Sequence, residues 1–505
     1  MRTYVAVDLG ATSGRVIAGR VEGGRLVTEE TARFANVPVS VPGPGGRSTL
    51  HWDVLRLWAG VQDGLAAAAR RFGPVTSVGI DGWAVDHGLL DVDGALLGNP
   101  VHYRDARTVG APARLFEQIS PERHHALTGV QVQPFNTVFQ LVAAAGTAQL
   151  GAARRALLVP DLLACWLTGE HVAELTNAST TGLLDVTTRA WSAEVAGAAS
   201  AVTGVDVGAL LPRLVAPGSV VGTVRPEVGA ALGVTGAPVV AVGSHDTASA
   251  VVAMPLGGRD AAWISSGTWS LVGLELDTPV LTAASRAANF TNELGVHGTV
   301  RFLRNVTGLW LLEQALATWA GQGRPQELEP LLGQAAAVPG LRCVVDVDDP
   351  VLAAPGDVPA RVAELARSTG QPVPHEPAEV VRVLLDSLAL AHARAVRQAA
   401  ELAGRDVAVV HLVGGGSRNA LLCRLTADAT GLPVEAGPAE GTATGNLLVQ
   451  AAAGGDVGDD LAAMRAVVRA STQVRRYDPS GDRAAWERAE ETLRDRSSSP
   501  GPRGS

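Results

Sequence analysis

Residues 8–15 combine an acid, glycines and hydroxyls in a spacing that could hold a nucleotide phosphate. Asp8 ends an apolar run, and glycines on either side of Thr12 and Ser13 precede a second apolar run. This order predicts a strand, a tight turn of exposed amides and a returning strand. Glycines let backbone N–H groups approach an anion, hydroxyls add donors, and the acid can hold a metal ion. The segment suits a magnesium–nucleotide site, with an ordinary Gly-rich hairpin and a capping acid as the alternative.

A second chemical cluster, Gly-Ser-His-Asp-Thr-Ala at residues 243–248, follows a predicted apolar strand. Open α/β sheets bind their ligands beyond strand ends. Asp246 is therefore a candidate general base, and Thr247 a candidate contact for phosphate or substrate. A helix N-cap formed by either side chain is the alternative, since it would also place a polar residue here.

Two glycine-rich segments in the second half could contact a nucleotide. Residues 412–419 place three glycines and Asn419 between a predicted strand and a predicted helix. Such a junction lets a planar ring or a phosphate lie against the backbone and the helix N-terminus. Residues 437–446 predict another Gly/Thr turn that could close the same site. A loop that merely needs tight turns is the alternative for 412–419.

Residues 261–277 repeat the plan of the first loop, with an apolar strand, a Ser/Gly/Thr turn and a second strand. The distance in sequence between this segment and the first hairpin is about half the chain length. Two halves of related plan would explain the repeat, and so would chance similarity of two hairpins.

Polar side chains between two apolar runs could read sugar hydroxyls. Asp81, Trp83, Asp86 and His87 lie in such a segment, where Trp83 could pack on a sugar face. A hairpin with a core tryptophan is the alternative for Trp83. The pair His124-His125 is expected in a solvated turn rather than at a metal.

The composition excludes several kinds of protein. All 41 basic residues are arginines, so the lysine of a P-loop, of a protein kinase or of Schiff-base chemistry is absent. A net charge of −9 and an aromatic content of 4% argue against a nucleic-acid partner. Three scattered cysteines predict neither zinc nor a disulfide framework and fit a cytoplasmic protein. We expect no signal peptide and no membrane helix.

Alternating strands and helices must position these groups, which indicates an α/β protein. Strands are predicted at 3–7, 15–21, 75–80, 87–91, 238–243, 262–265, 270–275, 341–345 and 407–413. Helices are predicted at 53–71, 111–119, 137–149, 376–403 and 418–430. The helix at 376–403 has the clearest apolar periodicity, with Gly404 at its end, and the tail from Ser497 is expected to be disordered.

Together the motifs resemble the FGGY family of carbohydrate kinases, which have the actin-like ATPase fold. Further short matches in the same order are Gly79-Ile80-Asp81, Tyr103-Arg104-Asp105, Gln133–Thr137, Pro160-Asp161, Glu174 with Thr176–Ala178, Ser265–Ser270 and Asn305 with Gly308–Leu312. The resemblance implies two actin-like ATPase (ribonuclease H-like) domains, with mixed sheets flanked by helices and the active site in the cleft between them. The expected domains are 1–243, 244–480 and, as a terminal helix and tail, 481–505.

The resemblance also implies a role for individual residues. The catalytic base falls on Asp246, and magnesium on Asp8 and Asp246. Substrate contacts fall on Trp83, Ala84, Asp86, His245, Asp246, Thr247 and Asn305. Contacts to ATP fall on Ala11, Thr12, Ser13, Gly14, Arg15, Thr268, Glu313, Gly415 and Asn419.

The implied activity is ATP- and Mg²⁺-dependent phosphorylation of the 1-hydroxyl of L-rhamnulose by a monomer or homodimer. Three positions depart from the family pattern. Ala84 stands where a glycine is expected, Glu313 where a glutamine is expected, and His87 where an aromatic such as Phe is usual. A kinase for another ketose, such as L-fuculose or xylulose, stays open because of Ala84. A catalytically silent sugar or nucleotide sensor has no need for a base at Asp246, and a chaperone-like ATPase would need a separate peptide-binding domain.

Overall fold

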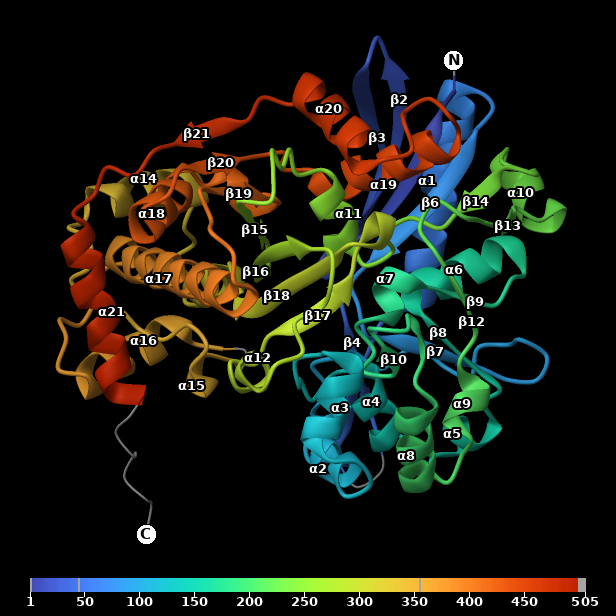
Figure 1. The fold of residues 1–505 in the computed structure, drawn as a ribbon, viewed down its shortest axis with the longest axis horizontal. Coiled ribbons are helices and arrows are strands. Elements are labelled where there is room, and N and C mark those ends of the chain that lie inside the picture. The colour runs from blue at the N-terminus through green and yellow to red at the C-terminus, as the bar shows by residue number, and fades with distance from the viewer. Residues whose placement is uncertain (1, 44–45, 354–355, 498–505) are drawn as a thin grey trace. The chain divides into compact units, whose positions relative to one another are not determined.

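The computed structural model describes residues 2–43, 46–353 and 356–497, whose contacts divide the chain into two units (Figure 1). The first unit holds the residues up to Pro255 together with Glu275–Phe302 and Gly441–Thr472. The second holds Leu256–Leu274, Leu303–Glu440 and the residues from Gln473 onward. The domain boundaries expected from the sequence stay a prediction.

A six-stranded sheet forms the centre of the first unit, in the order β13-β14-β6-β1-β2-β3. Its strands are β1 (Tyr4–Leu9), β2 (Ser13–Glu22), β3 (Arg25–Ala35), β6 (Ser77–Gly82), β13 (Val220–Thr223) and β14 (Pro238–Val240). Strand β1 runs antiparallel to β2 and parallel to β6. The predicted hairpin around residues 8–15 is thereby confirmed.

A seven-stranded sheet has the order β17-β18-β16-β15-β19-β20-β21. Its strands are β15 (Ala261–Ser266), β16 (Trp269–Leu276), β17 (Thr291–Leu294), β18 (Val300–Thr307), β19 (Val409–Val413), β20 (Val434–Ala436) and β21 (Arg475–Tyr477). Strand β15 runs antiparallel to β16 and parallel to β19, as β1 does to β2 and β6. The repeat of the hairpin plan seen in the sequence is thus present in the sheets.

The helices divide between the two units (Figure 1). In the first unit they are α1 (Val54–Phe72), α2 (Ala111–Phe116), α3 (Pro121–Thr128), α4 (Thr137–Ala143), α5 (Ala148–Ala152), α6 (Val159–Thr168), α7 (Leu175–Ala178), α8 (Ala193–Thr203), α9 (Val207–Leu210), α10 (Pro226–Leu232), α11 (Asp246–Val252), α12 (Ala283–Ala287), α19 (Gly441–Ala453) and α20 (Leu461–Ser471), with the 3₁₀ turns η2 (Ala106–Thr108) and η3 (Val296–Gly298). In the second unit they are α13 (Trp310–Gly321), α14 (Leu328–Ala337), α15 (Pro350–Ala353), α16 (Val358–Ser368), α17 (Pro377–Ala403), α18 (Ala420–Thr430) and α21 (Arg483–Ser497), with η4 (Gly415–Arg418). Short two-stranded pairs join β4 (Val39–Pro42) to β5 (Ser48–His51), β7 (His87–Leu90) to β8 (Arg155–Leu158), β9 (Val172–Glu174) to β12 (Arg213–Val215) and β10 (Leu184–Asp185) to β11 (Ala190–Trp191).

Strand alternation decides which side chains of the first sheet meet which helices, because successive residues point to opposite faces. On β1, Val5, Val7 and Leu9 pack in a core with α1 and α6. Tyr4 and Ala6 pack in a second core with α19 and α20. Asp8 has the parity of Tyr4 and Ala6, so it lies on the α19 face.

The predicted strand at 341–345 is wrong. The segment is buried at Cys343, Val344 and Val345 but belongs to no strand. Side chains satisfy its backbone donors instead, since the Val344 N–H donates to Gln371 and the Val345 N–H to Ser387. An apolar run is therefore buried here without pairing with a sheet.

Two other segments differ from prediction. The helix predicted at 137–149 is broken, because Gly146 at φ 78° separates α4 from α5. The Gly/Thr turn predicted at 437–446 is confined to its first residues, since α19 begins at Gly441. The long helix is confirmed as α17, with Gly404 in the left-handed conformation at its C-cap.

His124 and His125 do not lie in a solvated turn, so that expectation is wrong. Both are buried on α3. The His124 ring bonds through Nε2 to the carbonyl of Gly182 at 3.0 Å and lies against Phe139. Burial lowers the pKa of His124 to about 4. A histidine packed among aromatic rings is thus part of the core.

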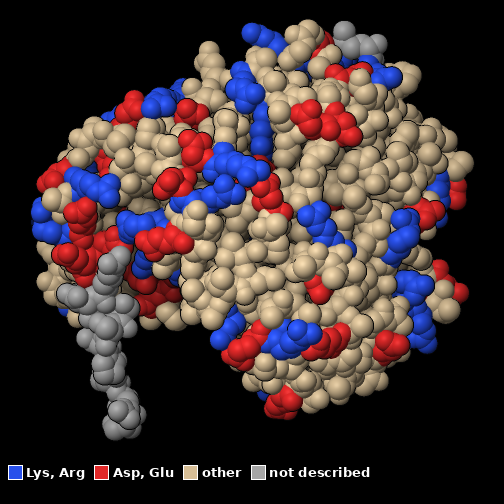
Figure 2. Space-filling model, viewed as in Figure 1, with Lys and Arg blue, Asp and Glu red and all other residues tan. Residues whose placement is uncertain are grey.

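On the face drawn in Figure 2, Arg side chains and Asp or Glu side chains are interspersed. In the part of the chain that the structure describes, no helix combines the length and the apolar character that a membrane span requires. The three cysteines are buried. The tail expected to be disordered lies outside the described residues from 498 onward.

Candidate functional site

The turn between β1 and β2 presents the predicted phosphate loop. The Gly10 N–H donates to the Ser13 carbonyl at 3.0 Å, which closes the turn. Asn36 supports it from outside, because its side-chain amide donates to the Gly10 carbonyl at 2.8 Å and its backbone N–H donates to the Thr12 carbonyl at 3.0 Å. Thr12 at the tip is exposed, while Ala11 is partly exposed. No motif in the sequence pointed to this role of Asn36.

Asp8 and Asp81 lie side by side at the ends of parallel strands. The register pairs Asp8 with Asp81 across β1 and β6, and with Arg15 across β1 and β2. Arg15 donates to Asp8 Oδ2 at 2.5 Å. Burial raises the pKa of Asp8. The charge on Arg15 lowers this pKa, and the charge on Asp246 raises it. Burial also raises the pKa of Asp81 well above its usual range, and Asp8 raises it further.

Helix α19 completes the surroundings of Asp81. Asn446 donates to Asp81 Oδ2 at 2.5 Å, and Gln450 donates to Asn446 at 2.6 Å. Gly79 leaves the room for this contact, because a Cβ there would lie 2.6 Å from Asn446 Oδ1. The other oxygen of Asp81, Oδ1, is buried without a hydrogen-bond partner. A cation or a proton would satisfy it.

The loop before α11 is held in place by Glu174. This buried carboxylate accepts hydrogen bonds from the backbone N–H and the hydroxyl of Ser244, each at 3.0 Å. It also caps α7, where it accepts from the N–H groups of Thr176 and Asn177. The Ser244 carbonyl in turn accepts from the Gly82 N–H at 2.9 Å. These bonds fix the backbone immediately before His245 and Asp246.

Asp246 is the first residue of α11 and leaves its carboxylate available. The N-cap of this helix is His245, and no side chain caps it. Asp246 accepts one hydrogen bond, from the hydroxyl of the buried Thr247 at 3.0 Å, and its side chain is 32% exposed. The capping alternative raised by the sequence is therefore not what the structure shows. A carboxylate free of a capping role can accept a proton from a substrate hydroxyl.

His245 connects Asp246 to a buried ion pair. Its Nε2 lies 3.5 Å from Asp246 Oδ1, and its Nδ1 lies 3.2 Å from Glu293 Oε2. Arg301 is buried behind it and pairs with Glu293 at 3.1 Å. Glu293 and Arg301 were not singled out in the sequence, because their chemistry depends on a contact with residues about fifty positions away.

Asp86 organises an aromatic cluster and is itself fully buried. Its carboxylate accepts from Trp52 Nε1 at 2.5 Å, from Trp83 Nε1 at 3.1 Å and from Gln140 Nε2 at 2.7 Å. Burial raises the pKa of Asp86 to about 6, and these bonds lower it. Trp83 is buried in the core of the first unit and lies against Trp52, with 4.2 Å between the ring centroids and a tilt of 37° between the rings.

The turn that carries Ala84 has an unusual backbone. Val85 adopts φ 68°, which is unfavourable for a β-branched residue. Its carbonyl accepts from the hydroxyl of Thr137 at 2.7 Å, and the Asp86 N–H donates to the Ala84 carbonyl. Ala84 is partly exposed while its neighbours are buried. Burial lowers the pKa of His87, the next departure from the family pattern, to about 3.

In the second unit, the turn between β15 and β16 carries Thr268 and anchors α13. The Gly267 carbonyl accepts from the Leu309 N–H at 2.9 Å, and the Thr268 carbonyl accepts from the Trp310 N–H at 3.2 Å. Glu313 lies in the first turn of α13 and is exposed. Asn305 lies on β18 and is partly buried.

The three-glycine loop begins where β19 ends, beside the end of β15. The register pairs Ser265 with Val413, so both loops leave the same edge of the sheet. Gly414 has φ 82°, and a Cβ there would lie 2.7 Å from the Ser266 carbonyl. At Gly415 a Cβ would meet open space. Asn419 caps α18 by accepting from the Leu422 N–H at 3.0 Å, so its oxygen already has a partner.

Each unit thus gathers part of the predicted set. The first brings Asp8, Arg15, His245, Asp246 and Thr247 to one sheet edge, together with Asp81. The second brings Thr268, the start of α13 and Gly415 to another. Within the described residues, no three His, Cys, Asp or Glu side chains converge as a metal-binding group. Magnesium would then be held by one or two carboxylates, water and phosphate oxygens.

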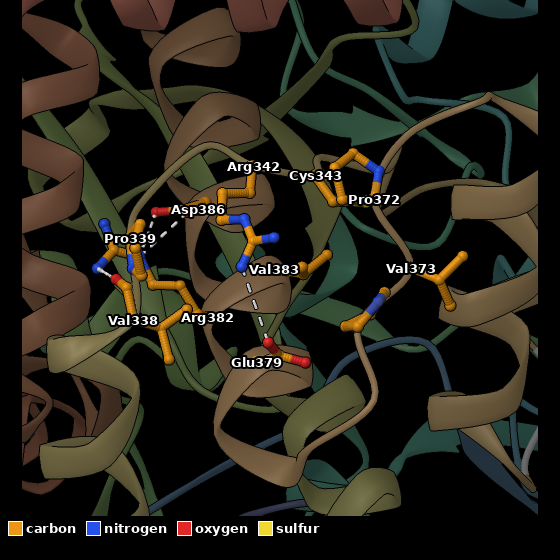
Figure 3. A pocket seen from close by; sticks show the side chains of 11 residues that line it. Val338, Pro339, Arg342, Cys343, Pro372, Val373, Glu379, Arg382, Val383 and Asp386 are labelled. Atoms are coloured by element: carbon orange, nitrogen blue, oxygen red, sulfur yellow. Dashed lines mark hydrogen bonds and ion pairs between the residues drawn. The ribbon is translucent and has the colours of Figure 1, made fainter.

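A hollow in the second unit is separate from these residues (Figure 3). Its lining includes Cys343, Arg342 and Arg382 but none of the predicted site residues. Arg382 pairs with Asp386 at 3.0 Å, and Arg342 lies 3.9 Å from Glu379, as the dashed lines show. Since both arginines face acids, the hollow offers little uncompensated charge to a phosphate.

Comparison with known proteins covers nearly the whole chain. Residues 3–253 match the N-terminal domain of the FGGY family of carbohydrate kinases, and residues 262–454 match its C-terminal domain. A protein of Bacteroides thetaiotaomicron named rhamnulokinase is 42% identical over 97% of this chain and 98% of its own length. One of Enterococcus faecalis with the same name is 38% identical over 95% of each chain.

Solved structures share the fold at lower identity. A xylulose kinase from Rhodospirillum rubrum superimposes with a TM-score of 0.76 at 23% identity, covering 98% of each chain. A glycerol kinase from Plasmodium falciparum, solved with ADP, gives a TM-score of 0.77 at 14% identity over 98% of each chain.

Proposed function

The chain belongs to the FGGY family of carbohydrate kinases, and on this premise we propose that it transfers the γ-phosphoryl group of ATP to the 1-hydroxyl of L-rhamnulose. The product is L-rhamnulose 1-phosphate, an intermediate of rhamnose catabolism. The similarity to proteins named rhamnulokinase along the full chain supports this choice of sugar. The phosphoryl transfer itself is supported by one geometric observation. The carboxylate of Asp246 does not cap α11, and it lies next to His245 at the sheet edge that also bears Asp8.

Asp246 acts as the general base in this proposal. It takes the proton of the sugar hydroxyl while that oxygen attacks the γ-phosphorus and ADP leaves. Glu174 supports the step by fixing the backbone at Ser244, and α19 supports it by packing against α11. Thr247 donates to Asp246 and so orients the carboxylate without protonating it.

The two hairpins are proposed to hold the phosphates of ATP. Backbone N–H groups and hydroxyls of Ala11–Gly14, with the Arg15 guanidinium behind them, offer donors from the first unit. Thr268 offers donors from the second, and the open backbone at Gly415 accommodates the adenosine. The reaction requires that ATP bound in this way reach the sugar bound beside Asp246. Donors aimed at the transferred group stabilise the charge that develops on it.

The carboxylates of the first unit suit a magnesium ion brought with ATP. Asp8 and Asp81 are buried and repel each other, and Asp81 Oδ1 has no hydrogen-bond partner. A divalent cation held by Asp8 and Asp246 would reduce the repulsion among these acids. When bound, magnesium neutralises charge on the phosphate oxygens.

The sugar is proposed to lie against the turn at Ala84, with His245, Asp246 and Asn305 as further contacts. Because Trp83 and Asp86 are buried and engaged with each other, we assign them to holding this turn in shape. The backbone of this turn is strained at Val85, so neighbouring residues must hold it in that conformation. We infer a cytoplasmic monomer or homodimer, and the three scattered cysteines fit a reducing compartment.

A ketose panel tests the proposal. Purified protein with MgATP is offered L-rhamnulose, L-fuculose and D-xylulose, and ADP release is measured to give kcat/KM for each. We expect L-rhamnulose to exceed the others by at least about tenfold, the effect of one well-placed hydrogen bond. A higher kcat/KM for L-fuculose or D-xylulose would assign the enzyme to that sugar. An Ala84→Gly variant shows whether this departure from the family pattern weakens L-rhamnulose binding.

A further inference from the structure

A buried ion pair lies directly behind His245 in the first unit. Arg301 on β18 is fully buried, and Glu293 on the neighbouring strand β17 is 5% exposed. Arg301 donates through Nε and Nη2 to the Leu294 carbonyl at 3.2 and 3.1 Å. Its Nη1 lies 3.1 Å from Glu293 Oε2. These contacts leave the guanidinium no freedom to turn away from His245.

Both members of the pair reach the same ring nitrogen of His245. Arg301 Nη1 and Nη2 each lie 3.2 Å from Nδ1, and Glu293 Oε2 also lies 3.2 Å from it. The guanidinium can only donate, whereas the carboxylate can only accept. An N–H at Nδ1 would face both of these N–H donors, and Glu293 Oε2 accepts no hydrogen bond from the ring in this geometry. A lone pair at Nδ1 satisfies Arg301 and leaves Glu293 paired with Arg301.

The surrounding charges keep Arg301 a cation. Burial lowers its pKa, while the carboxylates of Glu293, Glu174 and Asp246 raise it. An arginine starts from so high a pKa that it stays protonated in proteins. Because Arg301 keeps its protons, it is the donor in the hydrogen bond to His245, and Nδ1 is the acceptor.

We propose that Arg301 is a positioning residue that holds a lone pair at His245 Nδ1, so that the ring carries its proton on Nε2 and donates toward Asp246 and the sugar. This inference rests on the proposed function for its catalytic meaning. His245 Nε2 lies 3.5 Å from Asp246 Oδ1, too far for a strong hydrogen bond, so the N–H remains available to a sugar oxygen. A ring that donates there cannot accept the hydroxyl proton, which leaves that task to Asp246.

Nitrogen-15 NMR tests the protonation of the ring without any substrate. The two ring nitrogens of a neutral histidine resonate far apart, and the signals of His245 are identified by their loss in a His245→Gln variant. We expect the unprotonated signal at Nδ1. A neutral ring with its proton on Nδ1, or a doubly protonated ring, at neutral pH would overturn the proposal. The outcome does not depend on which sugar the enzyme uses.

Kinetics test the consequence. Replacing Glu293 and Arg301 together by methionine removes both charges, so the variant is expected to fold, as buried ion pairs often tolerate apolar replacement. We expect KM for the sugar to rise at least about tenfold, with KM for ATP unchanged, and the two His245 ring signals to indicate mixed forms. Unchanged sugar KM and unchanged ring signals in the folded variant would contradict the role of Arg301.

A matched variant separates this role from mere stability. Arg382 and Asp386 form another buried pair, at 3.0 Å on α17 of the second unit. Replacing both by methionine is expected to lower the melting temperature to a similar degree and to leave the sugar KM within about twofold. An Arg301→Lys variant, which keeps a donating cation, is expected to recover part of the lost affinity. If wild-type protein does not phosphorylate L-rhamnulose, the proposed function fails while the NMR result still stands.

Discussion

Asp8, Asp81 and Asp246 influence one another although they are far apart in sequence. Alternation along β1 and β6 places Asp8 and Asp81 on the α19 face, where burial raises the pKa of both. The charge on Asp246 raises the pKa of Asp8 further, and the charge on Asp8 raises that of Asp81. The hairpin around Asp8 could be predicted from local pattern, and so could the polar loop that carries Asp246, the proposed base. Asn446 and Arg301 could not be assigned roles, since these depend on contacts across 365 and 56 residues.

Asp81→Asn tests the repulsion between these acids. The folded-state pKa of Asp81 lies well above its ordinary value of 3.8, so the folded protein binds this proton more tightly than the unfolded chain. Wild-type stability therefore falls as pH rises above 4, whereas asparagine has no charge to bury. We expect the variant without ligand to be more stable at pH 8 by roughly 1–3 kcal/mol, with a smaller gain at pH 5. Urea unfolding at both pH values measures this.

The substitution removes the charge but keeps the hydrogen bond, because the asparagine oxygen can still accept from Asn446. A change in stability therefore reports the charge of Asp81. Saturating MgATP should shrink the difference, since a cation neutralises the wild-type acid. A variant that is less stable than wild type at both pH values, or a difference that does not change with pH, would contradict the repulsion.

At the scale of elements, α19 lies in very close contact with α11, the helix that begins at Asp246. A Cβ at Gly445 would lie 1.8 Å from the Ser249 carbonyl of α11, so no side chain fits between the helices. Sequence reasoning read residues 437–446 as a turn because glycine and threonine are frequent in turns. Tertiary packing instead uses those small residues inside a helix, which is a cause that local pattern does not contain.

Gly445→Ala tests this contact. Because the added methyl group must push α11 away, we expect roughly 1–3 kcal/mol of destabilisation and a fall in kcat of at least about tenfold. Gly197→Ala on α8 is the matched control, since a Cβ there meets nothing within 4 Å. It should raise stability by about 0.4–1 kcal/mol and leave kcat unchanged. Thermal melts and steady-state kinetics decide, and equal behaviour of the two variants would argue against a tight helix contact.

At the scale of the whole molecule, two sheets repeat one plan, an antiparallel hairpin beside a parallel strand. The repeat was visible in the sequence because hydroxyls and glycines mark both turns. The strand predicted at 341–345 failed since buried apolar runs need not join a sheet. The proposed phosphoryl transfer draws residues from both units, since Asp246 and the first hairpin belong to one and Thr268 and Gly415 belong to the other.

The most direct measurement is ATP-dependent formation of L-rhamnulose 1-phosphate by the Asp246→Asn variant. Asparagine keeps the size of the side chain but cannot take the hydroxyl proton. We expect kcat to fall roughly 10²–10⁴-fold, while the melting temperature and ATP affinity stay close to wild type. Near wild-type turnover by a folded Asp246→Asn protein would contradict the assignment of Asp246 as the base.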